Sequence, residues 1–154
     1  MSQQQEQACT FYLEDRMYAL DVQEVQEVTK SLPITPIPLA PSYVKGLINL
    51  RGQIAVSIDL REMFGLPKLE VNEFTNNIVC RTDGILMAFP VDRVGEVVEN
   101  DYNLFECTPD TVEPKIAQFM KGVFKSPHDI LSMLDIESIL KCLHQHGKAL
   151  GTEA

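Results

Sequence analysis

Apolar residues along this chain fall mostly in runs of four to seven, and turn-forming residues bound these runs. The runs are rich in Val, Ile, Phe and Tyr, which are the residues that β-strands favour. Short polar segments split the runs into three predicted β-hairpins: 10–13 with 17–22, 78–81 with 85–91, and a third within 47–59. The pattern therefore predicts a fold built mainly from short strands.

Two of the predicted turns end in glycine. Asp83-Gly84 is the stronger signal, because glycine accepts a positive φ angle at no steric cost. Arg51-Gly52 marks the bend of the hairpin within 47–59. Both pairs predict tight connections between neighbouring antiparallel strands.

Two stretches show helical spacing. Leu60, Met63 and Phe64 suit one or two helical turns that end at Gly65. The second stretch closes the chain and carries an apolar face at three- and four-residue steps: Ile136, Ile139, Leu140 and Leu143. We therefore expect one short helix and one longer C-terminal helix.

The chain also repeats itself. Segment 18–28 matches 87–97 at a constant offset, and both contain the pattern Val-x-x-Val-x-Glu-Val. A second offset relates two further pairs of segments: 44–47 to 120–123, and 58–60 to 134–136. Two units of this size are each too small to bury much apolar surface alone, so they are expected to share a core. The repeat predicts two small β-barrels packed face to face, with Asp59 and Asp135 in equivalent places.

Four valines of the repeated pattern invite a structural interpretation. They would close each barrel by pointing inward: Val22, Val28, Val91 and Val97. Likewise, Asp59 and Asp135 are interpreted as caps of the helical turns that follow them, in preference to acid–base groups.

Composition narrows the function classes. The chain has 154 residues and a net charge of −9, which disfavours nucleic acid and anionic lipid as partners. The N-terminus does not read as a secretory signal, and no apolar run suits direct membrane insertion. Four cysteines stand far apart without a CxxC pair, which is typical of a reducing, cytoplasmic compartment.

Candidate chemistry is sparse. The nearest approach to a metal cluster is Cys142-x-His144-x-His146, but on a helix only Cys142 and His146 share a face. The sequence holds no nucleophile elbow, P-loop or dinucleotide-binding loop. We therefore predict no catalytic residues, no metal and no cofactor, and expect that the protein is not an enzyme.

The segment 49–52, Asn-Leu-Arg-Gly, differs from its counterpart in the second repeat, where 125–128 reads Lys-Ser-Pro-His. Arg51 at this apex is either a partner contact or a solvated hairpin tip, and the residues alone leave both readings open. The proline-dotted stretch 33–41 is likewise either a rigid connector or a binding surface.

Taken in order, several motifs resemble the CheW-like domain over roughly residues 8–143. They are Phe11-Tyr-Leu, Tyr18-Ala-Leu-Asp-Val, Val25-Gln-Glu-Val, Ile34-Thr-Pro-Ile-Pro, Tyr43-Val-Lys-Gly, Asn49-Leu-Arg-Gly and Ser57-Ile-Asp-Leu-Arg. The run from Lys45 to Gly52 is the most specific part. The resemblance implies a mainly β fold of two fused, SH3-like, five-stranded barrel subdomains with short helices and a C-terminal helix. It places one domain at 8–146 and flexible tails at 1–7 and 147–154.

The resemblance also implies a function. Similar proteins are cytoplasmic adaptors of chemosensory arrays, which contact the cytoplasmic tip of a chemoreceptor and the regulatory domain of the histidine kinase CheA. Carried over by position, the receptor-binding surface comprises Val25, Glu27, Gly46, Asn49, Leu50, Arg51 and Gly52, with Glu27 and Arg51 close enough to pair. The opposite subdomain would meet the kinase through residues that the resemblance does not assign.

Other functions remain open at this point. The same module could serve another chemosensory output, such as twitching motility or gene regulation. A small-ligand-binding barrel or an enzyme is the alternative from a different class, and a convergent polar pocket would favour it.

Overall fold

The computed structural model describes residues 7–67, 70–125 and 129–149, with side chains as far as residue 145. Eleven strands make up about half of this part of the chain: β1 (Gln7–Leu13), β2 (Arg16–Asp21), β3 (Val25–Lys30), β4 (Val44–Leu50), β5 (Gln53–Ile58), β6 (Asn76–Thr82), β7 (Ile85–Val91), β8 (Arg93–Glu99), β9 (Phe105–Glu106), β10 (Met120–Lys125) and β11 (Ile130–Leu134). The helical elements are short apart from the last: η1 (Val22–Glu24), α1 (Leu60–Met63), η2 (Tyr102–Leu104), α2 (Pro114–Ala117) and α3 (Ile136–Ala149). The predictions of a mainly β fold and of a closing helix are confirmed.

All three predicted hairpins are present. Each closes through a two-residue loop, as the paired ends Leu13 with Arg16, Leu50 with Gln53, and Thr82 with Ile85 show. Both residues of the loops at 51–52 and 83–84 have positive φ angles, which is the geometry of a type I′ turn. The local turn signals therefore placed these strands correctly.

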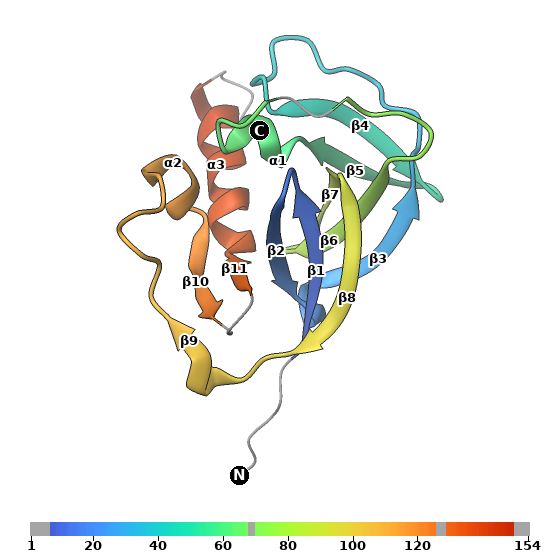
Figure 1. Cartoon of the computed structure of the whole chain (residues 1–154). Coiled ribbons are helices and arrows are strands. Elements are labelled where there is room, and N and C mark those ends of the chain that lie inside the picture. Colours follow the sequence, from blue (N-terminus) through green and yellow to red (C-terminus); the bar gives the residue numbers. More distant parts are fainter. Residues whose placement is uncertain (1–6, 68–69, 126–128, 150–154) are drawn as a thin grey trace.

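The strands form two sheets (Figure 1). Sheet A has six strands in the order β8-β1-β2-β11-β10-β9, and sheet B has five in the order β3-β6-β7-β5-β4. In Figure 1, β1 and β2 stand between sheet B and the pair β10–β11. Sheet B therefore uses one continuous stretch of chain, 25–91, whereas sheet A combines 7–21 with 93–134.

The sheets do not follow the two halves of the chain. The repeat relates β1, β2, β3, β4 and β5 to β6, β7, β8, β10 and β11, so the two sheet orders are equivalent strand by strand. However, each sheet takes its first hairpin from the other half. The predicted pair of similar subdomains is therefore present, but neither subdomain consists of one half of the chain, because the hairpins β1–β2 and β6–β7 are exchanged.

Equivalent backbone geometry supports the duplication. The N–H of Asp59 donates to the carbonyl of Tyr43 at 2.7 Å, and the N–H of Asp135 donates to that of Phe119 at 2.7 Å. The ladder between β4 and β5 shifts register just before Gly46, and the β10–β11 ladder does the same before Gly122. Asp59 and Asp135 hold equivalent places, as predicted.

The main hydrophobic core lies between the sheets and includes residues of α1 and α3. A row of aromatic rings crosses it, with centroid distances of 6.0 Å for Phe11–Tyr18, 5.6 Å for Tyr18–Phe64 and 5.9 Å for Phe64–Phe119. Two smaller apolar clusters lie within sheet B and sheet A, around Ile48 and around Phe124. Because both halves contribute to the shared core, the two sheets form one packed body.

The inward-pointing interpretation is wrong for two of the four repeated valines. Val91 is buried, but Val28 and Val97 are 46% and 53% exposed. Both stand on the terminal strand of their sheet, β3 in one case and β8 in the other. Alternate residues of a strand point to opposite faces, and on these terminal strands the valine points to solvent. The exposed position is the same in both repeats.

Charged side chains occupy the two places where the chain passes between the sheets. At the β7–β8 junction, the Nη1 of Arg61 lies 3.0 Å from Asp92, and its Nη2 lies 3.5 Å from Glu14. At the β2–β3 junction, burial raises the pKa of Glu24, and the charge of Lys121 opposes this shift. Arg61 therefore links the turn of the β1–β2 hairpin to the β7–β8 junction.

The duplicated aspartates provide a matched test of capping. Asp59 is fully buried, accepts a hydrogen bond from the N–H of Glu62 at 3.3 Å, and lies 3.8 Å from Lys45. Asp135 is only half-buried and accepts from the N–H of Glu137 and the hydroxyl of Ser138, both at 3.1 Å.

We expect Asp135→Ala to lower the free energy of unfolding by about 1 kcal/mol, the value of one cap. Asp59→Ala is expected to cost about 2–3 kcal/mol, because it also leaves a largely buried lysine without this carboxylate. Urea unfolding of both variants measures the difference. Equal losses would contradict the role assigned to Lys45.

Candidate partner-binding surface

An ion pair joins β3 to the tip of the β4–β5 hairpin. The guanidinium of Arg51 contacts the carboxylate of Glu27. The Glu27 side chain is 22% exposed and that of Arg51 is 70% exposed. Since β3 and β4 stand at opposite ends of sheet B, this contact shows that the sheet curls round to bring its two edges together. The pairing that the resemblance implied for Glu27 and Arg51 is therefore present in the structure.

The hairpin tip holds Arg51 in an unusual backbone conformation. Its φ angle is +52° and that of Gly52 is +91°. The side chain of Asn49 stabilises the turn by accepting a hydrogen bond from the N–H of Gly52 at 2.8 Å. Asn, Asp and Gly are the residues that such a turn favours, and a positive φ costs another residue about 1–2 kcal/mol. The backbone conformation of Arg51 therefore costs folding free energy that Asn, Asp or Gly would avoid. A role of its exposed side chain outside the fold would account for an arginine at this position.

A second arginine organises the neighbouring surface. Arg81 on β6 donates from Nε to the side chain of Gln26 at 3.1 Å and from Nη2 to that of Gln53 at 3.1 Å. It therefore links β3, β6 and β5 beside the Glu27–Arg51 pair. Sequence reasoning missed this network, although a lone charged residue at the end of an apolar predicted strand was the available signal.

The remaining residues of the predicted surface differ in exposure. Gly46 and Leu50 are buried, and Val25 is half-buried against the shared core. Asn49 and Gly52 are exposed and flank Arg51. Of the predicted surface, Glu27, Asn49, Arg51 and Gly52 are therefore at least partly accessible to a partner, whereas Gly46 and Leu50 are not.

Exposed apolar side chains accompany these polar groups. Val28 follows Glu27 on β3, and Ile54, which is 57% exposed, lies directly opposite Asn49 on β5. A charged pair with apolar neighbours is typical of a protein-binding surface, where apolar area drives association and charges fix the register. The site therefore suits a protein partner.

Metal binding and thiol chemistry find little support in the described part of the chain. No three of its His, Cys, Asp and Glu side chains are grouped to hold a metal ion. The predicted Cys142–His146 face cannot be assessed, since the His146 side chain lies outside the described residues. Cys142 instead lies 3.3 Å from the hydroxyl of Tyr43. Burial raises the pKa of the Cys80 thiol, which keeps it protonated and unreactive.

Comparison with protein families and proteins of known function gives a consistent result. The CheW-like domain family matches residues 7–143. A chemotaxis protein CheW of Thermotoga maritima is 30% identical over 132 residues, which cover 86% of this chain and 85% of that protein. A chemotaxis protein CheW of Helicobacter pylori is 30% identical over 131 residues, covering 85% of this chain and 79% of that protein.

Solved structures also include a similar protein. The crystal structure of the scaffolding protein TtCheW from Thermoanaerobacter tengcongensis superposes with a TM-score of 0.76 at 32% sequence identity. The match covers 85% of this chain and 89% of that one. In the part of the chain that the structure describes, no helix is both long and apolar enough to cross a membrane.

Proposed function

Because this chain belongs to the CheW-like family of chemotaxis proteins, we propose that it couples the cytoplasmic tip of a chemoreceptor to the regulatory domain of a CheA kinase. Its role is that of a scaffold and not of an enzyme. We further propose that residues 8–146 act as one folded adaptor, and that it works in the cytoplasm at receptor arrays.

The Glu27–Arg51 pair carries this proposal. It joins strand β3 to an exposed hairpin tip, and the exposed apolar residues Val28 and Ile54 lie on the same strand and the same hairpin. An exposed pair adds only about 0–1 kcal/mol to folding stability, so the fold has little need of it. At an interface, the same pair would fix the orientation of the receptor tip.

A scaffold must also transmit the state of one partner to the other. The shared core packs residues of both sheets and of both helices α1 and α3, so a partner bound on sheet B is held rigidly relative to one bound on sheet A. Receptor binding and kinase binding can then be linked through one body. We place the kinase contact on sheet A because the family resemblance implies that the kinase meets the subdomain opposite the receptor surface.

Co-sedimentation tests the proposed coupling. The purified chain is mixed with receptor-bearing vesicles and with the kinase, both cloned from the same organism. We expect the kinase to pellet with the vesicles only when the chain is present, because the chain would bridge the two. The control uses vesicles without receptor. Equal pelleting of the kinase with and without the chain would contradict the proposal.

A further inference from the structure

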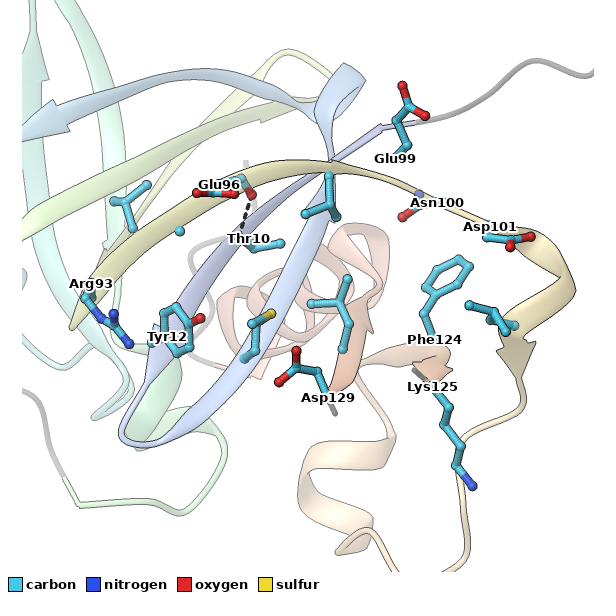
Figure 2. Close-up of a pocket in the computed structure, with 16 residues that line it drawn as sticks. Thr10, Tyr12, Arg93, Glu96, Glu99, Asn100, Asp101, Phe124, Lys125 and Asp129 are labelled. Carbon is cyan, nitrogen blue, oxygen red and sulfur yellow. Dashed lines mark hydrogen bonds between the residues drawn. The ribbon is translucent and has the colours of Figure 1, made fainter. Parts of the chain in front are cut away.

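A groove of about 750 Å³ opens on sheet A (Figure 2), and neither Glu27 nor Arg51 lines it. Strand β8 arches over it, and a hydrogen bond at 2.5 Å from the hydroxyl of Thr10 to the carbonyl of Glu96 holds that strand in place. Apolar side chains form its walls: Met17, Val98, Leu104, Phe124 and Leu131. The volume lies in the range of ligand sites, which are about 300–1,000 Å³.

Asn100 lines this groove and lacks hydrogen-bond partners. The residue is 8% exposed, and neither the nitrogen nor the oxygen of its side-chain amide is paired within the described part of the chain. Buried polar groups are nearly always hydrogen-bonded, so such an amide indicates a partner that binds from outside. A carboxamide both donates and accepts, which matches the N–H and C=O of a peptide unit.

The rim of the groove is predominantly acidic. Four carboxylates line it against two basic side chains, and both basic groups are already engaged. Arg93 stacks 3.9 Å above the ring of Tyr12, and Lys125 lies 3.3 Å from Glu106. By contrast, the carboxylates of Glu96 and Glu99 have no ion-pair partner among the residues that the structure describes. A ligand with positive charge would complement this rim.

The groove continues into a second hollow of about 840 Å³, which shares Tyr12, Met17, Lys125 and Asp129 with it. Two adjoining hollows suit an extended ligand better than a compact one. Strand β8 also ends its sheet, so one row of its main-chain groups faces away from any strand of sheet A. Extended peptides commonly bind along such edges.

We propose that this groove binds an extended peptide segment that carries a large apolar side chain next to a basic one. The apolar side chain packs against Val98 and Phe124, and the basic one faces Glu96. A peptide unit of the backbone pairs with the amide of Asn100. This inference goes beyond the proposed function, which assigns the receptor to the Glu27–Arg51 surface of sheet B and names no residues for the kinase contact on sheet A.

The repeat gives an independent reason to regard this face as a binding surface. Glu96 and Val97 occupy on sheet A the positions that Glu27 and Val28 occupy on sheet B. The duplication has therefore produced two faces with the same carboxylate and the same exposed valine. One carries an ion pair at its rim, whereas the other opens into a groove.

Fluorescence anisotropy with a dye-labelled, capped eight-residue peptide of alternating lysine and leucine tests the proposal on the full chain. We expect saturable binding that weakens as salt rises, and little binding of matched peptides with glutamate for lysine or serine for leucine. Asn100→Leu should lower affinity by about tenfold, because the peptide unit loses its hydrogen bonds. Its melting temperature should equal or exceed that of the wild type, because the free protein leaves this amide unpaired.

Matched charge variants distinguish binding in the groove from non-specific attraction of a basic peptide to an acidic protein. Glu96→Gln should lower affinity about three- to tenfold, whereas Glu73→Gln, an exposed carboxylate outside the groove, should not change it. Arg51→Ala should also bind the peptide as the wild type does, so that failure here is separate from failure of the proposed function. Equal effects of the Glu96 and Glu73 variants, or wild-type affinity in Asn100→Leu, would overturn the proposal.

Discussion

Replacement of Gly46 by alanine is expected to lower the free energy of unfolding by about 3–5 kcal/mol, which combines backbone strain with overpacking. The φ angle of Gly46 is +147°, a conformation that residues with a Cβ atom rarely adopt. A Cβ built at this position would stand 2.2 Å from the carbonyl oxygen of Thr35. That oxygen accepts a hydrogen bond from the N–H of Leu47 at 2.8 Å, so it cannot move away cheaply.

Two glycines elsewhere in the chain serve as controls for this prediction. Gly52 has a positive φ angle of +91° but open space around its Cβ position, so Gly52→Ala should cost only about 1 kcal/mol. Gly122 is the repeat equivalent, and its Cβ would meet the carbonyl oxygen of Glu106 at 2.5 Å. Gly122→Ala should therefore resemble Gly46→Ala. Urea unfolding that gives Gly46→Ala and Gly52→Ala the same stability would refute the close approach at Thr35.

The Gly46 result also affects how the predicted receptor surface is understood. Gly46 is buried beneath the segment around Thr35, so a loss of coupling in its variants would follow from a distorted or unfolded sheet B. Coupling assays on Gly46 variants therefore need a parallel measurement of folding. Arg51 offers a cleaner test, because its side chain lies mainly in solvent.

Replacement of Arg51 by alanine is expected to weaken receptor binding by at least about tenfold while leaving stability almost unchanged. Loss of a charged group from the centre of an interface typically costs about 2 kcal/mol or more of binding free energy. Removal of the exposed ion pair should change the free energy of unfolding by no more than about 1 kcal/mol. Titration of receptor-bearing vesicles with each protein, alongside thermal melts, measures both quantities.

The neighbouring charges provide the control for that result. Glu27→Gln removes the charge of the partner carboxylate and should weaken receptor binding in the same direction. Lys30→Ala removes a charge from the end of the same strand and should leave binding intact. If Arg51→Ala instead lowered the melting temperature strongly, Arg51 would belong to the fold and not to the partner surface.

The sequence predicted those parts of the fold that local signals determine. The three hairpins followed from turn residues such as Asp83 and Gly84, and the equivalent places of Asp59 and Asp135 followed from the repeat. The exchange of hairpins between the sheets could not be predicted. Strand β2 pairs with β11 in parallel, more than a hundred residues away, and no local signal encodes such a partner.

The exposure of residues on edge strands was the second feature that the sequence did not predict. The repeated Val-x-x-Val pattern suggested that Val28 and Val97 point inward, but their strands end the sheets and turn them to solvent. Conversely, Gly46 and Leu50 belong to the most specific motif of the chain and are buried. Asn100 gave no signal at all, since an unpaired amide becomes visible only when its surroundings are known.

Receptor-dependent autophosphorylation of the kinase tests the central claim most directly. Kinase, receptor-bearing vesicles and the purified chain are combined, and phosphorylation is followed for the wild type and for Arg51→Ala. The account predicts that the wild type stimulates the kinase only when receptor is present, and that Arg51→Ala, although equally stable, does not. Equal stimulation by the two proteins would contradict the assignment of the Glu27–Arg51 surface to the receptor.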